Sequence, residues 1–330
     1  MTAAPLTHWD EVVGRRVEVG PMAGVWRDLG HAVGTVTTGV RHIEIDPGRR
    51  STPVHTHDGE EEIYFVLAGA GSSWHDGQTH QIVAGDCIVH RAGGPAHTLV
   101  AGAGRLDVLA FGTRRPSALA RLPRAGVAWD GATWVVTGTE PHPWAREAAA
   151  GDLPAPPPEP RPPSIVGLQD VEAVTRGRGD ARFRERDLGT AAGSSASGLG
   201  YVEVDPGMLS YPPHAHSAEE EIFVVLAGGG TLLLYDCRAP SDGPKEEALR
   251  PGHVAAFPAG SGVAHGIRAG AAGITYLAYG ERAGDDVCFY PRSQKISFSA
   301  FGVVTRLPRL SYWDDEPPAA PVADDEPPPA

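Results

Sequence analysis

A pattern of histidines and a glutamate that occurs twice in the chain has the residue types of a metal-binding site. In each copy a His-x-His pair is followed by a glutamate, which opens an apolar run that ends at a glycine. The two copies match at one constant offset, which indicates an internal duplication. The matching residues are His55, His57, Glu62 and Gly69 in the first copy and His214, His216, Glu221 and Gly228 in the second.

The spacing of these residues brings their side chains together if the segments are strands. Residues i and i+2 of a strand point to the same face, so the two imidazoles of each His-x-His pair converge, and a carboxylate follows from the next strand. Imidazole nitrogen and carboxylate oxygen form a ligand set for transition metals. A later stretch in each half, residues 85–97 and 252–265, has a turn glycine, a strand, a second Gly/Pro-rich turn and a histidine. It supplies a third imidazole in each half.

The segments that carry these residues are predicted to be short strands. Residues 39–45 alternate apolar and polar side chains and end at Asp46-Pro-Gly, which is a turn signal. Residues 62–67 are rich in β-formers and are followed by a turn at Gly69. Strands separated by turn signals, with almost no helical periodicity, indicate an all-β sandwich or barrel.

The chain divides into two units of this kind. A length of 330 residues favours about two domains. The proline-rich residues 151–164 are predicted to be an extended, semi-rigid linker between an N-terminal domain, 1–150, and a C-terminal domain, 165–315. The acidic, proline-rich residues 316–330 are expected to be a disordered tail. The completeness of the repeat predicts two copies of one fold that face each other across a pseudo-twofold axis.

Composition excludes several function classes. The net charge is −13 and no basic patch, helix-turn-helix or zinc-finger pattern occurs, which argues against nucleic acid as a partner. The three cysteines show no Cys-x-x-Cys spacing, which favours a reducing compartment. Without a signal-like start or an apolar run of membrane-spanning length, we expect a cytoplasmic protein with no membrane partner. The sequence leaves a homo-oligomer open.

These motifs resemble those of the cupin superfamily, and the chain looks like the uncharacterised bacterial bicupins, which have two cupin domains in one chain. The first motif, His-x-His, Glu and Gly, is complete in both halves, whereas the second departs because Arg91 stands where the family usually has proline. The resemblance implies two double-stranded β-helix (jelly-roll) barrels. It also implies two ligand sets: His55, His57, Glu62 and His97, and His214, His216, Glu221 and His265.

The cofactor implied is a divalent transition metal at two sites per chain. Three imidazoles and one carboxylate suit Fe, Mn, Ni, Zn or Cu, and the residues leave the choice open. Four protein ligands in an octahedral sphere would leave positions for a substrate, water or dioxygen.

Other residues near the motifs are assigned by their strand positions. Tyr64 and Phe223 lie two residues beyond the glutamates and are expected to face the barrel interior, as core residues or as the wall of a substrate pocket. Arg91 could pair with an anionic substrate if its side chain points inward. We expect no site role for His90 and His253. Solvated turns are predicted at Glu60 and Glu61 and, in the second half, at Glu219 and Glu220.

The predicted function is that of a metal-binding bicupin which acts as a metalloenzyme on a small organic molecule. Dioxygenase, decarboxylase and isomerase chemistry all fit a metal with open positions. The alternative is a non-catalytic bicupin for small-molecule binding, sensing or storage. No serine-histidine-acid triad, P-loop or dinucleotide motif is present. Because the surroundings of the two motifs differ, we expect unequal sites, with the chemistry at the first.

Overall fold

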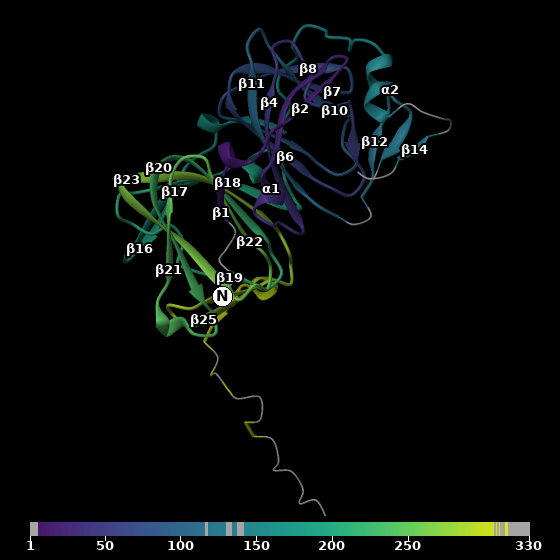
Figure 1. The fold of residues 1–330 in the computed structure, drawn as a ribbon. Helices are drawn as coiled ribbons and strands as arrows, with labels where there is room; N and C mark the ends of the chain where they lie inside the picture. Colours follow the sequence, from purple (N-terminus) through teal and green to yellow (C-terminus); the bar gives the residue numbers. More distant parts are fainter. Residues whose placement is uncertain are drawn as a thin grey trace, which may run out of the picture.

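A computed structural model shows two β-rich lobes, one from each half of the chain (Figure 1). It describes residues 6–115, 118–129, 134–136, 142–306, 308, 310 and 314–315, so the predicted tail at 316–330 lies outside the described residues. The predicted all-β class with two barrels is confirmed. None of the helices within the described ranges is long and apolar enough to cross a membrane.

The first barrel has a large antiparallel sheet in the order β15-β9-β6-β11-β4-β3-β2, a smaller sheet β10-β7-β8, and a third sheet β14-β13-β12-β5. A short helix α1 and a longer helix α2 accompany them. The bounds of these elements are β2 (Arg15–Val19), β3 (Met22–Asp28), α1 (Leu29–Ala32), β4 (Thr38–Ile45), β5 (Thr56–His57), β6 (Glu62–Ala68), β7 (Ala70–His75), β8 (Gln78–Val83), β9 (Asp86–His90), β10 (His97–Ala101), β11 (Leu106–Thr113), β12 (Ala120–Leu122), β13 (Val127–Trp129), β14 (Trp134–Val136), α2 (Pro143–Ala149) and β15 (Ile165–Gly167).

The second barrel repeats the arrangement. Its large sheet runs β1-β22-β20-β23-β18-β17-β16, with β21 paired to β20, and its small sheet runs β19-β24-β25-β26. The bounds are β1 (Leu6–His8), β16 (Val174–Arg178), β17 (Ala181–Asp187), α3 (Leu188–Ala191), β18 (Ser197–Val204), β19 (Ala215–His216), β20 (Glu221–Asp236), β21 (Lys245–Leu249), β22 (His253–Phe257), β23 (Val263–Glu281), β24 (Val287–Tyr290), β25 (Lys295–Phe298) and β26 (Val303–Thr305); 3-10 turns occupy η1 (Trp9–Glu11), η2 (Leu168–Asp170), η3 (Pro240–Asp242) and η4 (Ser299–Phe301).

The strand that begins with the motif glutamate is buried on both faces. In β6, Ile63 and Phe65 belong to one apolar cluster, while Tyr64 and Val66 belong to another inside the first barrel. Strand β20 has the same division, with Phe223 inside the second barrel. Alternation along a strand sends successive side chains to opposite faces, so each of these strands joins a barrel core to a second core outside it.

That second core is the contact between the two halves. It combines buried residues of the first barrel, such as Val40 and Leu109, with residues of the second, such as Leu188 and Leu277. At its centre the rings of Phe111 and Tyr279 stack with centroids 5.2 Å apart. Because this shared core is apolar and fully buried, it holds the halves together by the hydrophobic effect.

Two short strands cross between the halves. The N-terminal β1 pairs with β22 of the second barrel, and β15, which follows the proline-rich segment, pairs with β9 of the first. Residues 151–164 lie against the first barrel, where Trp74 Nε1 donates to Pro154 O at 3.0 Å and Arg161 pairs with Asp86 at 2.6 Å. The domain boundary at 151–164 stays a prediction. Strands β1 and β15 each pair with a strand on the other side of it.

The glycine that closes each first motif is required by the backbone. Gly69 has φ +86° and a Cβ there would lie 2.2 Å from the carbonyl oxygen of Arg105. Gly228 has φ +72° and the same clearance to the oxygen of Gly273. A left-handed conformation and contact with a neighbouring strand together leave space for glycine alone.

Candidate metal centres

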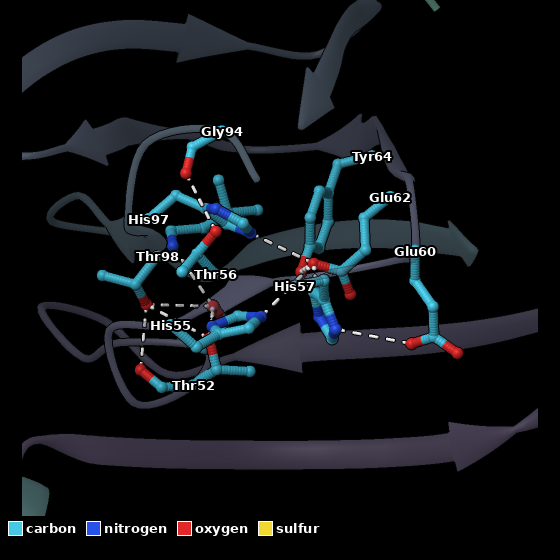
Figure 2. Close-up of polar contacts among 12 residues, drawn as sticks. Thr52, His55, Thr56, His57, Glu60, Glu62, Tyr64, Gly94, His97 and Thr98 are labelled. Carbon is cyan, nitrogen blue, oxygen red and sulfur yellow. Dashed lines mark hydrogen bonds and ion pairs between the residues drawn. The ribbon is translucent and has the colours of Figure 1, made fainter. Parts of the chain in front are cut away.

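In each barrel, separate segments of the chain bring the motif histidines to the start of the glutamate strand. In the first barrel β5 carries His57, β10 begins with His97, and two backbone hydrogen bonds of 3.1 and 2.8 Å join His55 to His97. Glu62 is the first residue of β6 and faces all three rings. Figure 2 shows the imidazoles of His55, His57 and His97 pointing at the carboxylate of Glu62.

The first centre is compact. One carboxylate oxygen, Oε2 of Glu62, lies 3.3 Å from Nε2 of His55, 3.3 Å from Nε2 of His57 and 3.1 Å from Nε2 of His97. The rings of His55 and His57 meet edge to face, with centroids 5.0 Å apart. Four potential ligand atoms from three segments therefore converge on one point.

Carbonyl oxygens orient two of these rings. Nδ1 of His55 lies 2.9 Å from Pro53 O, and Nδ1 of His97 lies 3.0 Å from Pro95 O. A carbonyl only accepts hydrogen bonds, so Nδ1 carries the proton in both rings. In the neutral imidazole the lone pair is then on Nε2, directed at the carboxylate. Two acceptors that face each other need a cation between them.

The second centre has the same plan. Oε2 of Glu221 lies 3.5 Å from Nε2 of His214, 3.5 Å from Nε2 of His216 and 2.7 Å from Nε2 of His265. Nδ1 of His214 donates to Pro212 O at 2.9 Å. Nδ1 of His216 contacts Oδ2 of Asp286 at 2.8 Å, and Asp286 also accepts the backbone N–H groups of Ser217 and Ala218.

The spacing of these atoms fits a coordinated ion. Ligands at about 2.1 Å from a metal, at right angles to one another, lie about 3 Å apart. The nitrogen–oxygen distances around Glu62 are close to that value. The groups His55–His57–Glu62 and His214–Glu221–His265 each place their ligand atoms within 4.8 Å of one another. Both donor sets therefore fit a divalent transition metal.

Without a metal, the buried charges hold protons in the same place. Burial lowers the pKa of His57, but the charge of Glu62 and contacts with Glu60 outweigh it and raise that pKa to about 10. Burial of Glu62 is likewise outweighed, by the charge of His57 and the hydrogen bonds of the imidazoles, so its pKa falls well below the usual range. In the metal-free protein, the proton on His57 therefore lies among the same ring nitrogens and carboxylate that would surround a metal ion.

Comparison with known proteins agrees with this geometry. The model of the cupin domain matches the chain twice, over residues 41–111 and 200–273. The chain is a bicupin of the cupin superfamily. The two matched segments contain the histidines and glutamates of the two candidate centres.

Solved structures show the same fold. The bicupin is 15% identical to an oxalate decarboxylase of Lactobacillus farciminis, solved as a formate complex, with 86% of this chain and 87% of that chain covered and a TM-score of 0.58. It is 14% identical to oxalate decarboxylase of Bacillus subtilis at pH 4.6, over 84% of this chain and 76% of that one, with a TM-score of 0.56. A search of curated proteins finds no match. At these identities the likeness is one of fold.

The interiors beneath the two centres of the bicupin differ. Beside Glu62 in the sheet stands His90, whose buried ring stacks on His97 with centroids 3.6 Å apart. Beside Glu221 stands Phe257, which stacks on His265 at 3.7 Å. The strand position of His75 in the first barrel corresponds to that of Leu234 in the second. At these two positions the first interior therefore carries imidazoles and the second carries hydrocarbon side chains.

The structure places the remaining predicted residues in two different surroundings. Tyr64 is buried in the first barrel, with its hydroxyl 3.5 Å from Oε2 of Glu62. Phe223 packs in the second barrel against Phe257. Arg91 instead is exposed and donates from Nε to Gly193 O in the other half, so the structure does not bring its guanidinium to the ligands.

Several residues near the centres contradict the sequence-based prediction. The predicted solvated turns are wrong, because Glu61 and Glu220 are only 2% and 1% exposed. Their neighbours also contact the centres, with Glu60 Oε2 lying 3.4 Å from Nδ1 of His57 and Glu219 Oε2 lying 3.5 Å from Nδ1 of His216.

Sequence reasoning missed Asp286 because it lies outside both motifs, on a loop beyond the last long strand. It also assigned no site role to His90, which is buried against His97. The sequence did contain a signal for His90. The repeat places the apolar Phe257 at the equivalent inward position of the second half.

Proposed function

We propose that the bicupin binds a divalent transition metal in each barrel and acts as a metalloenzyme on a small organic molecule. The observation that carries this proposal is the convergence of three Nε2 atoms on one carboxylate oxygen in both halves. Storage or scaffolding alone would not need two intact sets of oriented ligands.

When bound, such a metal supplies a Lewis acid with positions for a substrate or dioxygen. His55, His57, Glu62 and His97 would hold it, and the side chains of Glu62 and His57, which are 19% and 16% exposed, would leave it accessible to a substrate. Burial raises the pKa of Tyr64 well above its usual value, so its hydroxyl stays protonated. Beside Glu62 it would act as a hydrogen-bond donor for a substrate.

Among the three reaction classes, decarboxylation of a small carboxylic acid is the first to test. The solved structures of the same fold include proteins described as oxalate decarboxylases. The first barrel is the stronger candidate for the reaction, because His90 and His75 give it a polar interior, whereas the equivalent side chains in the second barrel are apolar. Dioxygenase and isomerase reactions are the other outcomes of the same experiment.

Elemental analysis of protein purified without chelator tests the metal, and incubation with oxalate and other small acids tests the reaction. We expect about two divalent metals per chain and release of carbon dioxide. Substrate-dependent oxygen uptake without carbon dioxide would select a dioxygenase. Bound metal and bound acid without turnover would favour the non-catalytic alternative, and absence of metal would overturn the proposal.

The choice between centres is tested by paired substitutions. His55→Ala should abolish turnover, because it removes a ligand of the first centre, whereas His214→Ala should leave most of it. Circular dichroism of both variants checks that they stay folded. The reverse pattern would move the chemistry to the second barrel.

A further inference from the structure

Two buried carboxylates join the metal centres to the contact between the halves. Glu61 directly precedes the ligand Glu62, and Glu220 directly precedes the ligand Glu221. Both are nearly inaccessible to solvent. A buried charge is costly unless it is paired or fully hydrogen-bonded, so the partners of these carboxylates indicate what they do.

The hydrogen-bond partners of the Glu61 carboxylate belong to the other half of the chain. Its carboxylate accepts hydrogen bonds from the hydroxyl of Ser194 at 2.5 Å, the N–H of Ser195 at 3.1 Å, and both the N–H and the hydroxyl of Ser197, at 3.1 and 2.8 Å. These residues form the loop that leads from α3 into β18. None of these donors is a cation, so the charge of the carboxylate is satisfied by hydrogen bonds.

Glu220 makes the reciprocal contact. Its carboxylate accepts the N–H groups of Val36, Thr37 and Thr38 at 2.8–3.1 Å and the hydroxyl of Thr38 at 2.7 Å. These residues form the loop that leads from α1 into β4 of the first barrel. Each half therefore holds the start of the other half's glutamate strand, across the pseudo-twofold axis.

We propose that Glu61 and Glu220 are positioning residues that set the metal affinity of Glu62 and Glu221 from the opposite half of the molecule. Successive strand residues point to opposite faces, so a carboxylate fixed outside the barrel fixes the backbone from which the ligand carboxylate projects inward. In its own half the start of β6 is paired through the backbone, where Glu62 lies opposite His90 and Gly112. The carboxylate of Glu61 adds a side-chain constraint from the other half. The inference rests on the proposed metal sites.

The test changes the donors in one half and measures the metal site in the other. The double variant Ser194→Ala/Ser197→Ala removes two hydroxyl donors to Glu61 and lies entirely in the second half. We expect it to weaken Mn(II) binding at the first centre about tenfold, as loss of outer contacts to metal ligands commonly does, and to leave the second centre unchanged. Thr38→Val in the first half should weaken the second centre alone.

Each centre is measured by itself, by titration with Mn(II) in chains that lack the other ligands. His214→Ala/His216→Ala isolates the first centre and His55→Ala/His57→Ala isolates the second. The visible spectrum of bound Co(II) reports ligand geometry, so it should change at the first centre in the serine variant. Glu61→Gln and Glu220→Gln probe the carboxylates directly. If either of these variants fails to fold, the serine and threonine variants still test the proposal.

Leu109→Ala is the matched control, because Leu109 is buried in the same contact between the halves but is not a hydrogen-bond partner of either carboxylate. It should lower thermal stability without changing either Mn(II) affinity. The proposal is overturned if the serine variant leaves the Mn(II) affinity of the first centre unchanged. It is also overturned if the serine variant weakens both centres equally. Wild-type protein that binds no metal would instead overturn the proposed function and, with it, this inference.

Discussion

At the scale of single residues, the two centres differ in what orients the second histidine of the His-x-His pair. His216 has Asp286 on its Nδ1 at 2.8 Å, whereas the equivalent ring in the first barrel has the carboxylate of Glu60 at 3.4 Å. The backbone contacts of Asp58 with Leu119 and of Ser217 with Val287 correspond, so Ala118 takes the place of Asp286 in the first barrel.

Asp286→Asn should weaken metal binding at the second centre about tenfold, because a carboxylate on Nδ1 increases the basicity of the coordinating imidazole. The first centre serves as the internal control and should keep its affinity. Isothermal titration with Mn(II) or Zn(II) measures both. An unchanged second centre would show that Asp286 orders its loop without acting on His216.

Metal binding should strengthen as the pH rises through the neutral range. His57 has a pKa raised to about 10 in the metal-free protein, so below that pH it carries a proton which an incoming metal must displace. Each displaced proton changes log Kd by about one per pH unit. Titrations with the first centre isolated, between pH 6 and about pH 9, would measure this slope, and a flat profile would contradict the prediction.

At the scale of elements, two turns of the first barrel, after β4 and after β6, need glycine for reasons that can be separated. Gly48 and Gly69 both have positive φ, but a Cβ at Gly48 meets nothing within 4 Å, whereas one at Gly69 meets the Arg105 carbonyl. The comparison separates backbone strain from a steric clash within one barrel.

Gly48→Ala should lower the free energy of unfolding by about 1 kcal/mol, the cost of a left-handed conformation. Gly69→Ala should lower it by about 1–3 kcal/mol more, because the added methyl must displace a neighbouring strand. Chemical denaturation of the metal-free variants gives both values. Equal effects would mean that the strand moves aside without cost.

At the scale of the whole molecule, the halves share a buried core and exchange β1 and β15. An interface with this much apolar surface resembles the interior of a domain more than a contact between independent ones. The two barrels are therefore expected to unfold together.

Thermal unfolding of the metal-free chain should show one transition. Leu188→Ala, in the shared core, should destabilise that transition by about 2–5 kcal/mol, as should Leu232→Ala inside the second barrel. Calorimetry of the three proteins distinguishes this from independent barrels, for which Leu232→Ala would split the transition and leave the first barrel unaffected.

The sequence by itself determined the fold class and the duplication, and it predicted which histidines and glutamates lie together, because each depends on local pattern. His-x-His followed by a strand that begins with glutamate is read directly from residue spacing, and the inward direction of Tyr64 follows from strand alternation. These properties need no knowledge of which strands lie side by side.

Only the tertiary structure decided how the halves meet and which polar residues that contact buries. Glu61 looks like a solvated turn residue until Ser194 and Ser197 are seen to surround it, and they lie far away in the sequence. The same is true of Arg91, which reaches Gly193, and of Asp286, which reaches His216. A side chain's protonation, partners and burial depend on the groups that face it, and for these residues those groups come from distant segments.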